Sequence, residues 1–248
     1  MLKFFRKIRR SLLREKAFGR YLIYAIGEIL LVVIGILIAL QVNNWQQEKR
    51  DSIKEQDVLE QLKTGFESNE RLIKSGMEQY QWQLGIQSLF IKNTGPDAVM
   101  PAPAELQDMY RINSTTINLS FGGSHSIVLN EYFDHTDNRE LKEEILSYLG
   151  QIPKYLEWED FDKEKTAIQR EIYAKYYSLA TNDPNLSEQL NSAYPSRTIE
   201  WLKDRETQNI ATMRIWAIKY NCLPILSALQ AQNQEILKII NAELEKLN

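Results

Sequence analysis

The 248-residue chain is poor in the residues that build disulfides, metal sites and tight turns. It contains one cysteine, two histidines, ten glycines and seven prolines. The lone cysteine, Cys222, excludes an internal disulfide, and its position in a helical pattern favours a buried, inert thiol. Few helix breakers, together with abundant Leu, Ile, Glu, Lys and Gln, favour helices over a β fold.

Motifs that carry catalysis or bind metals are absent from the sequence. His125 and His135 are ten residues apart with no cysteine nearby, which does not match a zinc-binding spacing. Ser124 precedes His125, but neighbours in sequence do not make a nucleophile–base pair, and the hydrolase motif G-x-S-x-G does not occur. Walker A, G-x-G-x-x-G and H-E-x-x-H motifs are missing as well. We therefore predict no catalytic residues, no metal and no cofactor, and a protein that is not an enzyme.

The acidic stretch EWEDFDKEKTAIQRE is the one candidate for a calcium loop. Positions 1, 3, 5 and 12 of such a loop would be Asp160, Asp162, Glu164 and Glu171. Position 6, where the sharp turn needs glycine, is Lys165. The stretch also fits a continuous helix, which cannot wrap a cation. We therefore predict a solvated helical face here rather than a calcium site.

Charge is distributed unevenly along the chain. Residues 1–20 carry eight basic residues and one acidic residue, a net charge of +7, whereas the remainder has 22 basic and 32 acidic residues, a net charge of -10. A basic arm beside an apolar run indicates an anionic membrane surface, and the acidic remainder would repel nucleic acid. We expect the arm to lie on the inner leaflet as a basic interfacial helix, and no nucleic-acid partner.

Next to this arm lies a long apolar run, residues 21–42. Its 22 residues reach roughly 33 Å as a helix, enough to cross a hydrocarbon core of about 30 Å. Fourteen of them are Leu, Ile or Val, which together favour insertion by roughly 4–8 kcal/mol. Glu28 opposes insertion by at most about 3 kcal/mol. The run therefore predicts a transmembrane helix.

The flanks of the run predict its orientation. Tyr21, Tyr24 and Trp45 stand at its edges, where amphipathic rings prefer the membrane interface. The basic arm precedes the run, which places the N-terminus in the cytoplasm and residues 43–248 outside the inner membrane. A cleaved signal peptide is the rival interpretation, but the run is too long and "IALQVNNW" lacks a small-x-small cleavage site.

Glu28 is the residue of the run that calls for an explanation. Either its side chain reaches back to the interface or is protonated, or it contacts a partner helix or an ion-conducting protein. Gly35 and Ala39 form a small-xxx-small pair, which permits close approach of another helix. Glu28, Gly35 and Ala39 are therefore the candidate contacts with a partner inside the membrane.

The N-terminal residues resemble a known family. "LKFFRKIRRSLL" followed by "YLIYAIGEILLVVIGILIALQVNNW" is similar to the opening of the bacterial domain-of-unknown-function family 6090, common in Bacteroidetes-type genomes. "TTINLS", "NRELKEEILSYL" and "EILKIINAELEKL" resemble its later blocks more loosely. The resemblance implies a single-pass inner-membrane protein with a helical extracytoplasmic part. It implies no activity and no catalytic residues, and it includes Glu28 in the membrane segment.

Beyond the run, the pattern predicts long amphipathic helices. The first extends over residues 43–91 and has two heptad positions on its apolar face. One position stays apolar from Leu59 to Tyr80. The other is apolar at Leu62 and is then occupied by Asn69, Gly76 and Gln83. Prolines and a glycine in 93–105 end it. Its apolar positions are Leu59, Leu62, Phe66, Ile73 and Tyr80.

Residues 104–135 are the least clear part of the sequence. "AELQDMYRI" favours a short helix, "NSTTINLSFGGSHS" is turn-prone, and "IVLNEYF" fits a strand or a helix, of which we prefer the helix.

Two further helices follow this segment. Asp137 is the expected N-cap of the first, which Pro153 should kink or split. A last helix is expected over residues 198–247, with a bend at Pro224. Its expected apolar side is Met213, Tyr220, Leu226, Leu229, Ile236 and Ile240. We expect Trp158, Trp201 and Trp216 to pack in the core or at an interface.

These patterns together predict an all-α protein: one N-terminal transmembrane helix followed by an extracytoplasmic bundle of long antiparallel amphipathic helices. The predicted function is a membrane-anchored scaffold or interaction protein of the bacterial envelope, which binds the lipid bilayer and either itself or another envelope protein. The alternative is an accessory or ligand-sensing subunit of a membrane complex, coupled through Glu28.

Overall fold

The structure, a computed structural model, describes residues 18–119, 136, 138–178, 188–189 and 194–247. Every regular element in these residues is a helix, which confirms the prediction of an all-α fold. In chain order the elements are α2 (Phe18–Asn93), α3 (Pro103–Met109), α5 (Arg139–Tyr176), α7 (Thr198–Lys203), α8 (Arg205–Ala217), the π-helical turn η2 (Ile218–Cys222) and α9 (Leu223–Leu247).

The chain forms two compact units, residues 1–55 and residues 56–248. α2 contributes to both units, because their boundary at Glu55 falls within this helix. The predicted arm, 1–20, and the predicted span, 21–42, both belong to the first unit. The boundary between arm and span stays a prediction.

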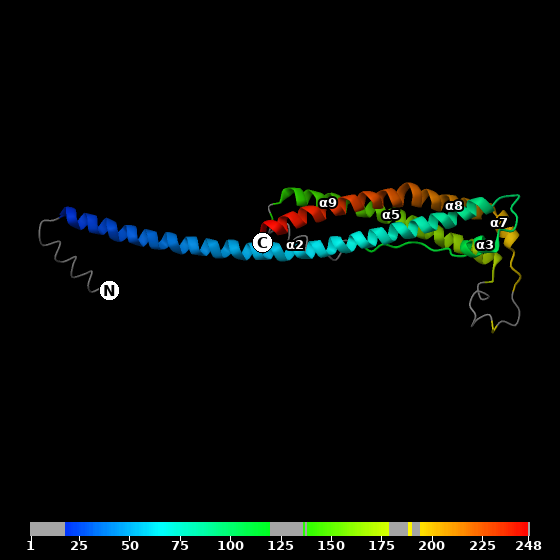
Figure 1. Cartoon of the computed structure of the whole chain (residues 1–248), viewed down its shortest axis with the longest axis horizontal. Helices are drawn as coiled ribbons and strands as arrows, with labels where there is room; N and C mark the ends of the chain where they lie inside the picture. The colour runs from blue at the N-terminus through cyan, green and yellow to red at the C-terminus, as the bar shows by residue number, and fades with distance from the viewer. Residues whose placement is uncertain (1–17, 120–135, 137, 179–187, 190–193, 248) are drawn as a thin grey trace. The chain divides into compact units, whose positions relative to one another are not determined.

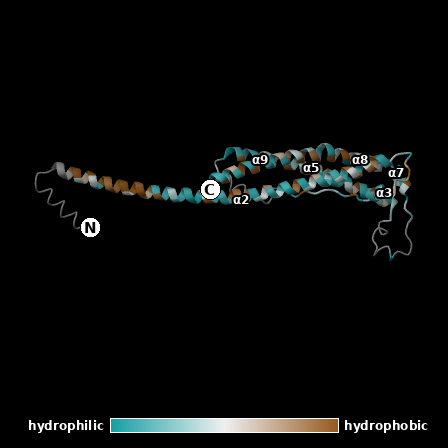
Figure 2. Cartoon of the chain, in the orientation of Figure 1, coloured by the Kyte–Doolittle hydropathy of each residue, from teal (hydrophilic) through white to brown (hydrophobic). Residues whose placement is uncertain are grey.

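The N-terminal unit contains an apolar helical segment without a core of its own. Among the described residues, one helix is long and apolar enough to cross a membrane by length and composition, and the apolar part of it is not buried. Figure 2 shows this part as the brown section of α2. Its exposed large side chains include Leu22, Ile23, Ile26, Ile29, Leu30, Leu31, Val32, Val33, Ile34, Ile36, Leu37, Ile38, Leu40 and Val42.

In the C-terminal unit, the later part of α2 lies beside α5, α8 and α9 (Figure 1). Hydrogen bonds show that α2 and α5 run in the same direction. Asn69 donates to the Tyr148 hydroxyl (3.1 Å), and further along both helices Gln169 donates to Gln87 Oε1 (3.0 Å). The prediction that neighbouring long helices run antiparallel is therefore wrong for this pair. The described residues 112–119 of the segment between them run back along the unit.

α8 and α9 run opposite to both of these helices. Gln208 near the start of α8 donates to the Thr94 carbonyl just after α2 (3.3 Å), and Asn233 in α9 donates to the Phe66 carbonyl (2.9 Å). α2 and α5 thus run one way along the unit, and α8 and α9 run the other way. This arrangement brings residues that are far apart in sequence to the same level of the unit.

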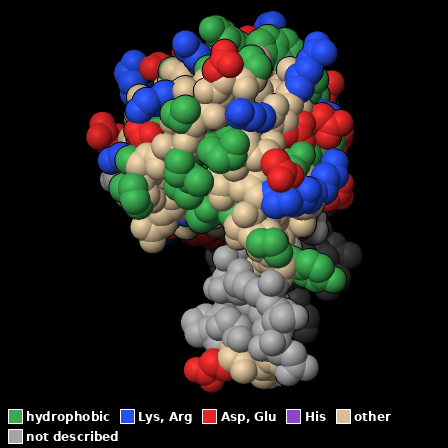
Figure 3. All heavy atoms as spheres, turned by 90° about the vertical axis from the view of Figure 1, so that its right-hand side faces the viewer, with side chains coloured by type: hydrophobic (Ala, Val, Ile, Leu, Met, Phe, Trp, Pro, Cys, Tyr) green, Lys and Arg blue, Asp and Glu red, His purple; other side chains and the backbone are tan. Residues whose placement is uncertain are grey.

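Two apolar clusters form the core of the C-terminal unit. The larger one includes the predicted heptad positions of α2, all of which are buried, and Asn69 and Gln83 are buried beside them. Leu141, Ile145, Tyr148 and Ile152 of α5 join it, as the spacing predicted. The smaller cluster gathers at the end that holds α3 and α7, where Phe90, Trp201 and Met109 are fully buried. Figure 3 views this end, whose surface mixes hydrophobic, basic and acidic side chains.

α5 begins one residue later than the sequence predicted. Its N-cap is Asn138, whose side-chain oxygen accepts a hydrogen bond from the Leu141 amide (2.8 Å). The predicted cap, Asp137, lies outside the described residues. α5 is continuous through Pro153, and Ile152 and Tyr155 on either side of the proline are buried in the core.

The predicted last helix is divided in two places. Asp204 ends α7 and caps α8, and its side chain accepts from the Glu206 amide (2.8 Å). Further on, the Leu223 amide donates to the Ile218 carbonyl, which defines the π-turn η2 just before Pro224. Pro224 has no amide proton and cannot donate the usual α-helical hydrogen bond. The wider π-turn lies immediately before this position, where the regular α-helical bonding is interrupted.

The π-turn also explains why two predicted core residues are exposed. It inserts one extra residue, so the buried face of α8 and that of α9 do not share one heptad register. Met213 and Tyr220 are 45% and 60% exposed, whereas the predicted core residues of α9 are fully buried. Those buried residues are Leu226, Leu229, Ile236 and Ile240.

Candidate functional site

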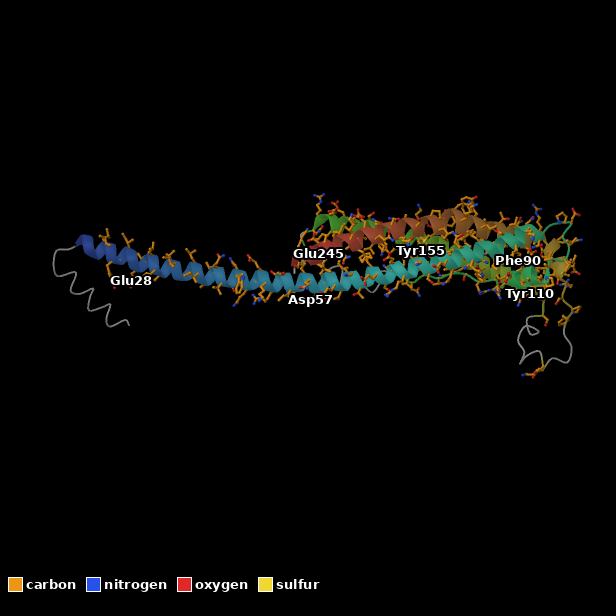
Figure 4. All side chains as sticks on the ribbon, in the orientation of Figure 1. Glu28, Asp57, Phe90, Tyr110, Tyr155 and Glu245 are labelled. Carbon is orange, nitrogen blue, oxygen red and sulfur yellow. The ribbon has the colours of Figure 1, made fainter. Side chains whose placement is uncertain are left out.

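The first candidate site is the face of the apolar helix that carries Glu28. Because an α-helix turns by about 100° per residue, Glu28, Gly35 and Ala39 lie within about 40° of one another around the helix axis. A Cβ atom added at Gly35 would meet nothing within 4 Å, so this face is open to a neighbour. Glu28 is exposed, and Figure 4 labels its position on the helix. Ala25 and Val32 line a shallow hollow of about 280 Å³ beside it.

A buried polar layer separates the two apolar clusters of the C-terminal unit, and Arg214 is its centre. The Arg214 and Asp162 side chains are both fully buried, and Arg214 Nε donates to Asp162 Oδ1 at 2.9 Å. Arg214 Nη1 donates to Gln169 Oε1 (2.8 Å) and Nη2 to Gln83 Oε1 (2.8 Å). Burial raises the pKa of Asp162, and the guanidinium of Arg214 opposes that rise. One cation thus connects α2, α5 and α8.

A second buried carboxylate, Glu159, extends the layer by one helical turn. Glu159 Oε2 accepts from the Tyr155 hydroxyl (2.6 Å), and Lys163 donates to Oε1 (2.6 Å). The Tyr155 hydroxyl lies 3.3 Å from that of Tyr80 in α2. Burial raises the pKa of both tyrosines, so the two hydroxyls keep their protons and act as donors.

These buried groups hold an extended segment, residues 112–117, which we call the strap. Arg214 Nη2 donates to the Asn113 carbonyl (2.6 Å), and Glu159 Oε2 accepts from the Ile117 amide (2.9 Å). Gln83 donates to the Thr115 hydroxyl (2.6 Å). Figure 1 shows the segment after α3 running back along the unit. The polar layer therefore fixes a non-helical chain against three helices.

This layer overturns the prediction of a solvated face for the acidic stretch of α5. Glu159 and Asp162 are buried and paired, while Asp160, Glu164 and Glu171 are exposed. The stretch is helical throughout, as predicted. The described residues contain no group of three or more His, Cys, Asp or Glu side chains placed to hold a metal ion.

The signal that reveals the buried acids is the continued spacing of the core face. Tyr148, Ile152 and Tyr155 are followed at the same steps of four and three by Glu159 and Asp162. A pattern search that counts apolar residues alone stops at Tyr155. Extending the period through polar residues would have placed both acids inside.

An aromatic patch lies on the surface of the C-terminal unit, between α5 and α8. The Trp158 and Trp216 rings pack edge to face with centroids 4.9 Å apart, and Phe161 packs against Trp158 at 5.6 Å. Trp216 is 49% exposed, and Lys165 lies over the Phe161 ring at 4.8 Å. Exposed aromatic clusters of this kind are typical of protein interfaces. Of the three tryptophans expected in the core or at an interface, Trp201 is fully buried.

The remaining residues singled out by the sequence carry no site in the described structure. Cys222 is buried, and burial raises the pKa of its thiol to about 12, which confirms the prediction of a buried thiol. Ser124, His125 and His135 lie outside the described residues, as does the segment "IVLNEYF". The short helix predicted at "AELQDMYRI" is confirmed as α3.

The comparisons with known proteins yield no relative: no protein-family model matches the chain, and neither the curated proteins nor the solved structures contain a match.

Proposed function

We propose that the protein is a single-pass membrane-anchored interaction protein, whose C-terminal unit lies outside the inner membrane of a bacterial cell and binds itself or another envelope protein. The observation that carries the proposal is the exposure of the apolar side chains in the segment Leu22 to Val42. Leaving such a segment in water forfeits about 1.5–3 kcal/mol for each large aliphatic side chain. Lipid is the solvent that recovers this free energy without a protein core.

The orientation follows from the basic arm, which favours the cytoplasmic side. This places the helical unit in the periplasm, where an anchored protein meets other envelope proteins. The exposed aromatic patch at Trp158 and Trp216 supports binding to such a partner. Membership of the domain-of-unknown-function family 6090, proposed from the N-terminal residues, agrees with this arrangement.

Alkaline carbonate extraction of membranes tests the anchor. The wild-type chain should stay in the pellet. The double variant Val33→Arg/Ile34→Arg adds roughly 5–7 kcal/mol at the centre of the helix, which cancels most of the favourable insertion energy, so it should be extracted. The matched control Asn43→Arg/Asn44→Arg adds the same charge beyond the apolar run and should stay in the pellet. Extraction of the wild-type chain would refute the anchor.

A second candidate function is that of an accessory subunit coupled to a membrane complex through Glu28. The common face of Glu28, Gly35 and Ala39 favours it, because a helix packed closely on the small residues would meet the carboxyl group.

Crosslinking in native membranes distinguishes the two functions. Glu28→Gln removes the carboxyl group within the run, and Glu48→Gln removes one beyond it as a control. If capture of a partner is lost only in Glu28→Gln, the accessory subunit is favoured. If capture survives that change but is lost when residues 56–248 are deleted, the interaction protein is favoured.

A further inference from the structure

The groove filled by the strap has the properties of a binding site for an extended peptide. Its contacts with the strap come from Gln83 of α2, Glu159 of α5 and Arg214 of α8. Its polar groups contact the main chain of the occupant at three points. Arg170 Nε donates to the Ile112 carbonyl (2.9 Å), Arg214 to the Asn113 carbonyl (2.6 Å), and Glu159 accepts from the Ile117 amide (2.9 Å). Main-chain contacts are available from any extended sequence.

Only a few side chains of the strap contact the groove. Ile112, Thr115 and Ile117 are buried, whereas Asn113 and Thr116 are exposed. The Asn113 side chain nevertheless accepts a hydrogen bond from Arg170 Nη2 (2.9 Å). Buried and exposed residues thus alternate in the last part of the strap, as in a chain bound along one edge. The groove therefore accepts an apolar residue, a residue with a side-chain acceptor, one variable residue, a hydroxyl residue, one variable residue and a second apolar residue.

Gly76 of α2 shapes the pocket for the second apolar residue. A Cβ atom added at Gly76 would lie 2.0 Å from Cδ1 and 2.6 Å from Cγ1 of Ile117. A side chain at position 76 would force the Ile117 side chain to shift. At Gly85 of the same helix, an added Cβ would meet nothing within 4 Å. The glycine at 76 is therefore a feature of the groove and not of the helix.

The strap itself is held without regular secondary structure. Within the described residues, its hydrogen bonds from main chain to main chain are local ones, from the Ile112 amide to the Tyr110 carbonyl (3.0 Å) and from the Leu119 amide to the Ile117 carbonyl (3.2 Å). The groove meanwhile buries two carboxylates and a guanidinium, a more costly way to fix a segment than apolar packing. Charged groups that bond to main-chain atoms do not depend on the side chains of the bound segment. A site built from them can therefore bind different sequences.

We propose that this groove is a peptide-binding site, that the strap occupies it in the isolated chain, and that an extended segment of a partner protein with the same pattern displaces the strap. The inference rests on the proposed function as an interaction protein and specifies the class of partner. Binding of a peptide in the groove does not require the membrane anchor. A negative result in the peptide-binding test therefore leaves the carbonate extraction unaffected, and the reverse also holds.

Fluorescence anisotropy with the full chain in detergent micelles tests the proposal. The probe is a fluorescein-labelled peptide with the sequence of residues 111–119. The host is a variant in which the strap is replaced by Gly and Ser residues of equal number. This host should bind the peptide saturably, and the wild-type chain should bind it at least about tenfold more weakly, because its own strap competes.

Two controls identify the groove as the binding site. A peptide with Ile117→Asp should bind about tenfold more weakly or worse, since burial of one isoleucine is worth about that factor. A host that also carries Gly76→Leu should lose binding to a similar extent, and one that carries Gly85→Leu should keep it. A helical host that fails to bind the peptide, or that binds the Ile117→Asp peptide equally well, would overturn the proposal.

Hydrogen exchange of the wild-type chain keeps the proposal testable if the strap-less host does not fold. Amides of the strap, that of Ile117 included, should exchange through a local opening well before those of α5. Exchange of these amides only at the rate of global unfolding would show that the strap is a permanent part of the core and would overturn the proposal.

Discussion

Replacement of Arg214 by methionine is the most demanding test of the buried polar layer. Methionine fills a similar volume but removes the cation from a fully buried pair with Asp162. It also leaves the side-chain oxygens of Gln83 and Gln169, and the Asn113 carbonyl, without the donor that each has in the wild-type chain. Both the charge and the hydrogen bonds of the layer are lost in one change.

The expected loss of stability is about 3–5 kcal/mol at neutral pH, because removing one partner of a buried ion pair leaves the other charge uncompensated. For a unit of this size that corresponds to a fall in Tm of about 6–20 °C. Asp162→Leu in the same background removes the stranded carboxylate. The double variant Arg214→Met/Asp162→Leu should therefore recover at least about 2 kcal/mol relative to Arg214→Met alone.

The loss should also depend on pH with a defined sign. Burial raises the pKa of Asp162, and without Arg214 that pKa rises further. The folded variant then binds a proton more tightly than the unfolded chain, in which an aspartate has a pKa of about 3.9. The stability of the variant is thus highest below about pH 4 and falls as the pH rises from there toward its folded-state pKa. Its loss relative to the wild-type chain grows between the folded-state pKa of Asp162 in the wild-type chain and that in the variant.

Thermal unfolding of the full chain in detergent, followed by near-ultraviolet circular dichroism between pH 4 and pH 8, measures these effects. A loss below about 1 kcal/mol at pH 7 would show that the pair is not buried as the structure has it. A double variant no more stable than Arg214→Met would refute the argument that a stranded charge causes the loss.

Three further predictions use the same unfolding assay or simple labelling. Gly76→Ala should destabilise the chain by about 1–3 kcal/mol through contact with the strap, whereas Gly85→Ala should stabilise it by about 0.5–1 kcal/mol; equal effects would contradict the tight contact. In the π-turn, Ile218→Ala should cost about 2–5 kcal/mol and Tyr220→Ala less than about 0.5 kcal/mol; the reverse order would mean that the register is wrong. Cys222, with its pKa raised to about 12, should resist maleimide at pH 7 until the chain unfolds, and rapid labelling of the folded chain would argue against its burial.

The helices and their apolar faces could be predicted because both follow from local spacing. Leu59, Phe66, Ile73 and Tyr80 are seven residues apart, and a helix places such residues on one side whatever packs against them. The length and composition of the apolar run were equally local information. The proposed contact of Glu28 involves a partner that the chain does not contain, so it stays a prediction.

The features that the sequence did not reveal depend on residues distant from one another. Arg214 pairs with Asp162 across 52 positions and with Gln83 across 131, and no short window contains both partners. The parallel course of α2 and α5 likewise involves contacts between distant residues, such as Asn69 with Tyr148 across 79 positions. The π-turn left a local trace, since the step from Tyr220 to Leu226 is six residues and Pro224 lies between them.

Labelling of single cysteines in intact cells tests the membrane-anchored arrangement most directly. Glu235→Cys places an exposed thiol on α9, and Ser11→Cys places one in the basic arm; the buried Cys222 provides the unlabelled background. A membrane-impermeant maleimide that has crossed only the outer membrane should label Glu235→Cys before lysis and Ser11→Cys only after it. Labelling in the opposite order, or recovery of the intact chain from the soluble fraction without detergent, would contradict the account.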